Sequence, residues 1–350
     1  MEDFNRNMEV ILIPGKFLVV DEIMSMWLGK DGKYAVEGMP HVTKITRKPE
    51  GVGAEMKAVA DGDTGCIIGV DLMEGAARMA LRPFIDRYPA GTAVCLRLCG
   101  FWRGSGRIVI GDSWLGSVVC LIGLRQELGL FFMGMVKTAH RRFPKAHFDD
   151  WFIARKAGGL PRGVWNTLTS MYVVDHEGTP FEFPMYAVAW HDKTCKKIIS
   201  NVGTTLPAQL PSIRHWTSVD DVGGIPTTVD KTTAIPRPAM FELFYRCFSS
   251  IDVNDHTRQG LLAIERTWRT NSWSMRVFGT LFGVMVTNAY NLHKYDRKTA
   301  HIEPSDFYAF VDELGAALID IGGNRGQMIL RQAGLAAAPV ARAANDYDGQ

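Results

Sequence analysis

The stretch that decides the fold class runs Arg107-Ile108-Val109-Ile110-Gly111-Asp112. Its β-branched apolar residues predict a short buried strand, and a carboxylate, Asp112, follows directly after it. The same pattern occurs earlier in the chain, where the apolar run Phe17–Val20 ends in Asp21 and Glu22. The sequence thus predicts two buried strands, each of which delivers a carboxylate at its end.

The segments around these two strands alternate between strand and helix patterns. Turn-like residues 61–65 separate two further strands, which join the strand at 17–20 in a predicted three-strand meander. Helices are expected where apolar and basic residues recur at helical spacing, and a helix and a strand follow Asp112. The expected strands are 17–20, 54–59, 66–72, 107–110 and 130–136, and the expected helices are 76–87, 91–99 and 115–128. The first part of the chain is therefore predicted to be α/β.

After residue 137 the composition becomes basic and aromatic, with frequent Pro and Gly. Strands are expected at 170–175, 185–190 and 197–202, followed by a loop over 203–237 and by helices at 238–267, 272–292 and 304–321. The Ala-rich end is expected to be disordered. The predicted domains are an α/β part over 1–137, a β-rich insertion and loop over 138–237, a helical part over 238–325 and a disordered tail over 326–350.

Composition narrows the class of protein. The chain has 350 residues, of which 47% are hydrophobic and 22% charged, so it can bury a full core. Its apolar runs fall short of the roughly 18 to 20 residues that span a bilayer, and its charged first residues are unlike a signal peptide, so an intracellular protein without a membrane partner is expected. Six cysteines without a CxxC pair predict neither a disulfide framework nor a structural zinc site. A net charge of +2 does not by itself indicate nucleic-acid binding.

The carboxylates after the two strands suit metal-dependent phosphodiester chemistry. Such an enzyme needs carboxylates from separate segments, because each Mg²⁺ takes one or two protein oxygens and completes its shell with water and substrate phosphate. Asp21 and Asp112 meet this requirement, and Asp252 and Asp255 lie three residues apart in a predicted helix, so both face the same way. Spacing alone leaves an ordinary explanation open, since Asp is also common at strand ends and helix starts.

Three ordered segments around these aspartates resemble the piggyBac-type transposase domain. They are Val20–Lys57, with its Lys-Pro pair and Gly-x-x-x-Lys spacing, Gly104–Ser117 and Ser249–Trp273. The resemblance covers roughly residues 10–320. It departs at Ser249-Ser250, where the family commonly has Gly-Gly, and at Ser113, where it has Asn, so backbone packing and a local hydrogen bond are expected to differ there.

The resemblance implies a ribonuclease-H-like core of the DDE/DDD transposase type with a β-rich insertion domain. It implies that Asp21, Asp112 and Asp252 are catalytic and hold two Mg²⁺ (or Mn²⁺) ions, with Asp255 as a fourth acidic ligand. Family members excise DNA of transposable elements and reinsert it at TTAA sites, because metal-activated water cuts the strand and the freed 3′ hydroxyl then attacks. The implied partners are DNA and a second copy in a homodimer, and the implied location is the nucleus.

Two other functions stay open from the sequence. Family members carry a long segment before the first aspartate, and many carry a cysteine-rich zinc domain, neither of which is found in this sequence. The alternative is therefore a domesticated or truncated, non-catalytic DNA-binding or interaction protein that keeps the transposase fold. An unrelated carboxylate hydrolase such as a glycosidase would need two facing carboxylates, and the sequence identifies no such pair.

A basic cluster follows the strand predicted at 130–136. It consists of Lys137, His140, Arg141, Arg142 and Lys145. The family places a basic loop at this point, so the resemblance implies that the cluster binds the phosphate backbone of DNA. The ordinary interpretation is a solvated loop, because a run of charges is usually surface.

Overall fold

The computed structural model describes residues 1–31, 38–46, 48, 51–137, 141–176, 179–222 and 225–332. The chain forms two compact units, Met1–Tyr295 and Asp296–Gln350. All the site residues predicted from the sequence belong to the first unit, although His140 lies outside the described residues.

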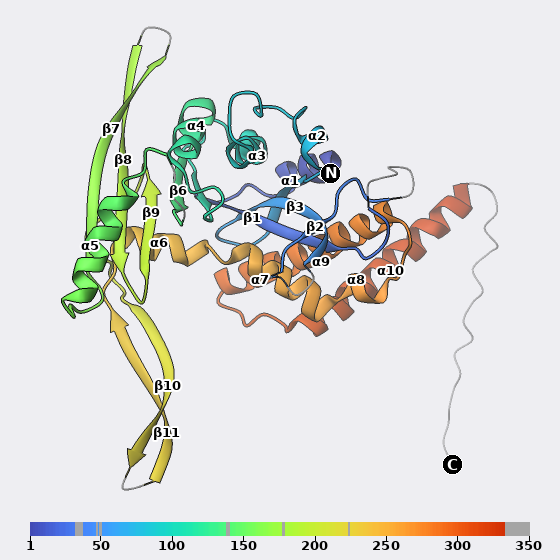
Figure 1. Cartoon of the computed structure of the whole chain (residues 1–350). Helices are drawn as coiled ribbons and strands as arrows, with labels where there is room; N and C mark the ends of the chain where they lie inside the picture. Colours follow the sequence, from blue (N-terminus) through green and yellow to red (C-terminus); the bar gives the residue numbers. More distant parts are fainter. Residues whose placement is uncertain are drawn as a thin grey trace. The chain divides into compact units, whose positions relative to one another are not determined.

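The first unit is built on a mixed sheet whose core has five strands in the order β4-β3-β1-β5-β6. Figure 1 labels β3, β1 and β6 of this core. The strand β3 (Val52–Asp61) pairs antiparallel with both β1 (Phe17–Met26) and β4 (Ile67–Leu72), which confirms the predicted meander. The strands β5 (Ile108–Gly111) and β6 (Phe131–Met135) run parallel to β1, and the short β2 (Thr43–Lys44) pairs with β3. Three antiparallel strands followed by two parallel ones form the predicted ribonuclease-H-like core.

Alternating side chains of β1 enter two separate cores, because successive residues of a strand face opposite sides of a sheet. Leu18 and Val20 pack with α3 (Ala90–Cys99) and α4 (Val118–Leu128), whereas Val19 and Ile23 pack with α6 (Ala239–Cys247), α7 (Ser250–His256) and α9 (Trp273–Thr299). The first face also receives Met8 of α1 (Glu2–Ile11) and Met79 of α2 (Ala76–Met79). Helices thus cover both faces of the sheet, and β1 lies between the two layers of helices.

Helix α4 shows how local sequence sets the boundaries of an element next to Asp112. The Ser117 side chain accepts a hydrogen bond from the Cys120 amide at 3.1 Å, so the helix begins at Val118 rather than at the predicted Leu115. It ends at Gly129, whose φ of 67° is the left-handed conformation that glycine adopts without strain. Because α4 begins only at Val118, Asp112 lies in the turn between β5 and α4.

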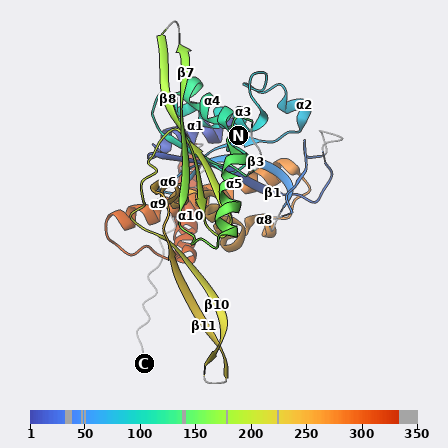
Figure 2. The same cartoon turned by 60° about the vertical axis from the view of Figure 1, so that its left-hand side comes forward.

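The insertion extends the core sheet. It contains α5 (Lys145–Ala157), β7 (Trp165–His176), β8 (Thr179–His191) and β9 (Cys195–Ser200), and β9 pairs antiparallel with β6. A second, two-stranded sheet of β10 (Ser212–Val222) and β11 (Ile225–Ile235) runs away from it (Figure 2). The β-rich insertion predicted from the sequence is therefore present, and its strands β7, β8 and β9 belong to the same nine-stranded sheet as the core.

Some predicted elements are wrong. The loop expected over 203–237 contains the β10–β11 hairpin, which the sequence signals by Thr and Val residues on either side of Gly223-Gly224. The helix expected over 76–87 ends at Met79, and the amides of Leu81 and Arg82 form turns with the main-chain oxygens of Arg78 and Met79. Pro83 has no N–H group with which to continue the helix. Helices α1 and α5 were not predicted. The segment expected as one helix over 238–267 is divided into α6, α7, a π-helical stretch at Thr257–Leu262 and α8 (Ile264–Thr267).

The second unit, Asp296–Gln350, contains the end of α9 and α10 (Phe307–Gln332). Residues 326–332 of the tail expected to be disordered belong to α10, and residues 333–350 lie outside the described residues. Among the described helices, none combines the length and apolar character that crossing a membrane requires.

Candidate active site

The pairing of β1 with β5 places the first two aspartates side by side. The two parallel strands pair from Phe17 with Ile108 up to Val20 with Gly111, and Asp21 and Asp112 are the next residue on each strand. Asp112 directly follows β5, whereas Asp21 lies within β1, which continues to Met26 instead of ending at Val20 as expected. Neighbouring strands lie about 4.8 Å apart, so the two side chains meet at this point. The two carboxylates predicted from the sequence therefore come together through the register of the sheet.

The turn that carries Asp112 is shaped by its neighbours. Asp112 Oδ1 accepts a hydrogen bond from the Trp114 amide at 2.9 Å, which closes the turn after β5. Gly116 packs so closely against β6 that a Cβ atom there would lie 1.8 Å from the main-chain oxygen of Met135. Close packing thus requires glycine at position 116, and this packing keeps the turn with Asp112 against the sheet.

Three carboxylates converge at this point. Oxygens of Asp21, Glu22 and Asp112 all lie within 4.8 Å of one another. Burial, followed by the hydrogen bond to Glu22 and the repulsion from Glu22, raises the pKa of Asp21 to about 8, and Asp112 adds to the repulsion. Burial also raises the pKa of Asp112. Carboxylates this close together, two of them buried, repel one another when ionised, and a bound cation would relieve this repulsion.

Asp252 enters the site from the helical part of the chain. It lies in the first turn of α7, where Ile251 packs into the core and Asn254 donates to the main-chain oxygen of Gly65 at 3.3 Å. Asp252 remains half exposed, and together with Asp21 and Asp112 it lines one cavity of about 600 Å³. Carboxylates from β1, from the end of β5 and from α7 therefore face a common space.

The sequence model of a transposase family, described as Transposase IS4, matches residues 1–290. The chain belongs to this transposase family. Its structure is also similar to a cryo-EM structure of the piggyBac transposase synaptic complex with hairpin DNA, with a TM-score of 0.61 at 16% sequence identity. The similarity covers 95% of this chain but 60% of that one, so the chain spans less than two thirds of that transposase. No curated protein matches the chain.

These comparisons confirm the predicted resemblance to a piggyBac-type transposase domain in family and in fold. The family uses divalent metal ions, and the cluster of Asp21, Glu22 and Asp112 is the candidate place for them in this transposase domain.

Lys48, whose side chain is mostly buried, links α7 to β1 in the transposase domain. Lys48 Nζ donates to the main-chain oxygen of Glu22 at 2.9 Å and lies 3.4 Å from Asp252 Oδ1 and 3.3 Å from Asp255 Oδ2. Burial alone lowers the pKa of Lys48, but the surrounding carboxylates, led by Asp255, raise it above its usual value. Lys48 is therefore charged, and it ties the third acidic segment to the first.

Asp255, grouped with the metal ligands in the sequence prediction, faces other partners. Its Oδ1 lies 2.7 Å from Arg258 Nη2, and Arg258 also pairs with Glu265 and donates to the main-chain oxygen of Met24 at 3.0 Å. Asp255 does not line the cavity that the three other aspartates share. In this structure its carboxylate joins α7 to the buried Arg258, and its role as a ligand stays a prediction.

The basic cluster predicted after β6 is divided by the structure. Lys137 lines the carboxylate cavity, whereas Arg141 and Arg142 are exposed in a turn and Lys145 pairs with Asp149. His140 lies outside the described residues. Lys137 is thus the one member of the cluster described at the cavity.

Sequence reasoning missed three charged residues of the site. Glu22 was noted beside Asp21 at the end of the expected strand but was not assigned to the metal site. Lys196 and Lys197 of β9 also line the cavity, and Lys197 Nζ is held 2.6 Å from Asp149 Oδ1. Their signal in the sequence is a Lys-Lys pair at the start of the strand predicted over 197–202, but nothing local showed that β9 would lie beside β6.

The raised pKa of Asp21 predicts a dependence of stability on pH and metal. Between about pH 4, where an ordinary carboxyl ionises, and about pH 8, folded Asp21 keeps a proton that the unfolded chain has released. Without metal, the contribution of Asp21 to the free energy of unfolding should therefore fall as pH rises through this interval. Urea denaturation with Mn²⁺ and with chelator should show a larger stabilisation by Mn²⁺ at about pH 8 than at about pH 5.

The control for this prediction is Asp21→Asn, which keeps the shape of the side chain without its charge. This variant should lose most of the pH-dependent part of the Mn²⁺ effect. Equal stabilisation of the unsubstituted protein at both pH values would contradict the assignment.

Proposed function

We propose that this transposase domain cleaves DNA phosphodiester bonds and transfers the cut strand in a divalent-metal-dependent reaction. The observation that carries the proposal is the convergence of Asp21, Asp112 and Asp252, from three separate elements, on one cavity. Charged oxygen ligands from separate segments are what a two-metal phosphoryl-transfer site requires. The carboxylate cluster favours catalysis over the non-catalytic alternative.

The donor atoms fit hard divalent cations. The cluster of Asp21, Glu22 and Asp112 offers only carboxylate oxygens, which suit Mg²⁺ or Mn²⁺, and its raised carboxyl pKa values indicate a site short of positive charge. We propose that Asp21 and Asp112, with Asp252 from α7, hold two such ions, and that Glu22 supports them. When bound, the ions would lower the pKa of the attacking water or 3′ hydroxyl and neutralise charge that develops on the phosphate.

The residues around the carboxylates would position the DNA strand. Lys137, Lys196 and Lys197 line the same cavity and can bind phosphate oxygens on either side of the scissile bond. Lys197 is fixed by Asp149, whereas Lys137 is exposed and able to follow a strand. Lys48 keeps Asp252 and Asp255 close to β1, which preserves the distance from α7 to Asp21 and Asp112.

We also propose DNA as the partner of this chain, because the similar structure is that of a transposase in a complex with hairpin DNA. Cut-and-paste at TTAA sites, a homodimer and a nuclear location stay predictions from the family resemblance. The binding site for DNA would include the lysines of the carboxylate cavity.

Metal removal tests the proposed function directly. Labelled DNA that carries transposon ends should be cut by the purified chain in Mg²⁺ or Mn²⁺, and chelator should reduce the rate to background, because carboxylates alone cannot activate the attacking water. Readdition of Mn²⁺ should restore cleavage. Cleavage that continues in chelator, or that Ca²⁺ and Mn²⁺ support equally, would contradict a two-metal mechanism.

A further inference from the structure

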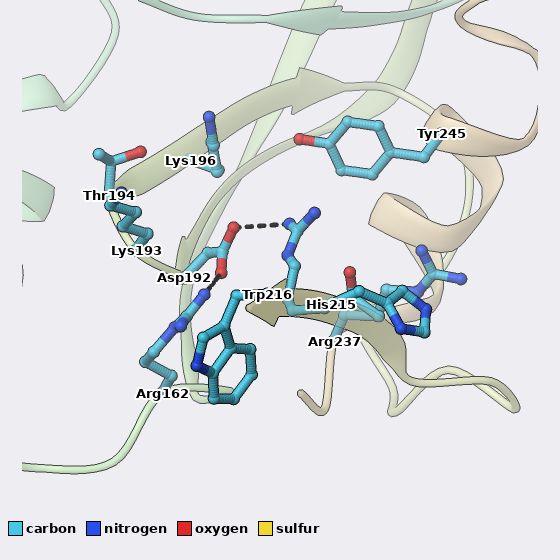
Figure 3. Close-up of a pocket in the computed structure, with 11 residues that line it drawn as sticks. Arg162, Asp192, Lys193, Thr194, Lys196, His215, Trp216, Arg237 and Tyr245 are labelled. Carbon is cyan, nitrogen blue, oxygen red and sulfur yellow. Dashed lines mark hydrogen bonds and ion pairs between the residues drawn. The ribbon is translucent and has the colours of Figure 1, made fainter. Parts of the chain in front are cut away.

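A second cavity, of about 1000 Å³, lies between the β8–β9 turn, β10 and α6 (Figure 3). Charged residues dominate its lining. They are five cations and one carboxylate, Arg162, Lys193, Lys196, Arg214, Arg237 and Asp192. A space of this size with a strong excess of positive charge is typical of a binding site for an anionic ligand.

The single carboxylate of this basic cavity organises two of its arginines. Asp192 is 4% exposed, and its two oxygens pair separately, Oδ1 with Arg162 and Oδ2 with Arg214 at 2.6 Å (Figure 3). An arginine has five N–H donors, so each guanidinium keeps donors for a ligand after it has paired with Asp192. Asp192 therefore fixes both arginines in place but neutralises only part of their charge.

An aromatic surface completes the basic cavity. Trp216 of β10 lines the basic cavity and is 46% exposed, so part of its ring is accessible to a ligand. Tyr245 of α6 directs its ring into the cavity from another side (Figure 3). An exposed indole among phosphate-binding cations is the combination that proteins use to stack bases of single-stranded nucleic acid.

The basic cavity adjoins the carboxylate cavity. Thr194, Lys196 and Tyr245 line both. A strand whose phosphate lies at Asp21 and Asp112 can therefore continue past Lys196 into the basic cavity without leaving the protein surface.

We propose that the basic cavity binds unpaired nucleotides of the DNA strand that runs from the carboxylate cavity. The proposal rests on the proposed function, and it adds a site for single-stranded DNA next to the cleavage site. The arginines and Lys196 bind phosphates, and Trp216 stacks on a base. Unpaired nucleotides fit better than duplex, because the face of a base is accessible to Trp216 only when the base is unstacked.

Binding of DNA with and without an overhang tests this site. The whole chain carrying Asp112→Asn is used in chelator, so that no cleavage occurs, and binding is followed by fluorescence anisotropy. A duplex with a short single-stranded overhang should bind about tenfold tighter than a blunt duplex of the same sequence. Adding Trp216→Ala should remove this preference, whereas Trp216→Phe should keep most of it, because an aromatic face remains.

A second variant separates phosphate binding from stacking. Lys196→Ala should reduce the magnitude of the slope of log affinity against log salt concentration for the overhang duplex by about 0.7, the value expected for one phosphate of a single strand.

Trp268→Ala is the matched control for Trp216→Ala, since Trp268 is also exposed but lines neither cavity. It should leave the preference for the overhang intact.

Equal binding of the two duplexes, or a preference that Trp216→Ala leaves unchanged, would overturn the proposal. This result differs from a failure of the proposed function, which would appear as an absence of metal-dependent cleavage by the unsubstituted chain. Thermal unfolding of each variant shows whether a loss of binding reflects a loss of folding.

Discussion

Asp112→Asn should reduce metal-dependent DNA cleavage by about a thousandfold or more, with the fold intact. Asparagine keeps the size of the side chain and can still accept from the Trp114 amide, but it removes one negative charge from the cluster with Asp21 and Glu22. A hard cation that loses a charged ligand binds weakly, and groups that act as one catalytic unit show losses of this size when one is removed.

The comparison has two controls. Asp150→Asn, an exposed position on α5, should cleave at the normal rate. In chelator, Asp112→Asn should be at least as stable to urea as the unsubstituted protein, because the substitution relieves repulsion among buried carboxylates. Normal cleavage by Asp112→Asn would refute the assignment of this carboxylate to the active site.

Arg258→Met should lower the free energy of unfolding by about 3 to 5 kcal/mol, the usual cost of breaking a buried ion pair on one side. Arg258 is 2% exposed and is held between Asp255 and Glu265. Its removal takes one cation from each of two buried carboxylates, although Asp255 keeps Lys48 at 3.3 Å, and the hydrogen bond to the main-chain oxygen of Met24 is lost as well. Urea denaturation monitored by tryptophan fluorescence measures the change.

A compensated variant separates charge from packing. Arg258→Met combined with Asp255→Asn and Glu265→Gln should recover much of the loss, because the uncompensated charges are gone. Arg141→Ala, at an exposed position, should change stability by less than about 0.5 kcal/mol. A loss below about 1 kcal/mol for Arg258→Met would show that the ion pairs contribute little to the attachment of α7.

Much of the core was predictable because its information is local. The apolar runs before Asp21 and Asp112 predicted β1 and β5, and the helical spacing before Gly129 predicted α4. The β10–β11 hairpin was missed, because its strands carry mostly polar residues and form a separate two-stranded sheet instead of burying an apolar face in the core.

The sequence by itself determined most elements of the core and the two apolar runs that precede Asp21 and Asp112, since hydrophobic period is read within a few residues. The structure extends the first of these strands past Asp21 to Met26. Only the tertiary structure decided which side chains meet across the chain. It placed Lys48 against Asp252, 204 positions away, turned Asp255 to Arg258, and set Lys196 between the carboxylate cavity and the basic cavity. Such contacts depend on strand register and helix packing over long separations, and no local pattern of residues encodes them.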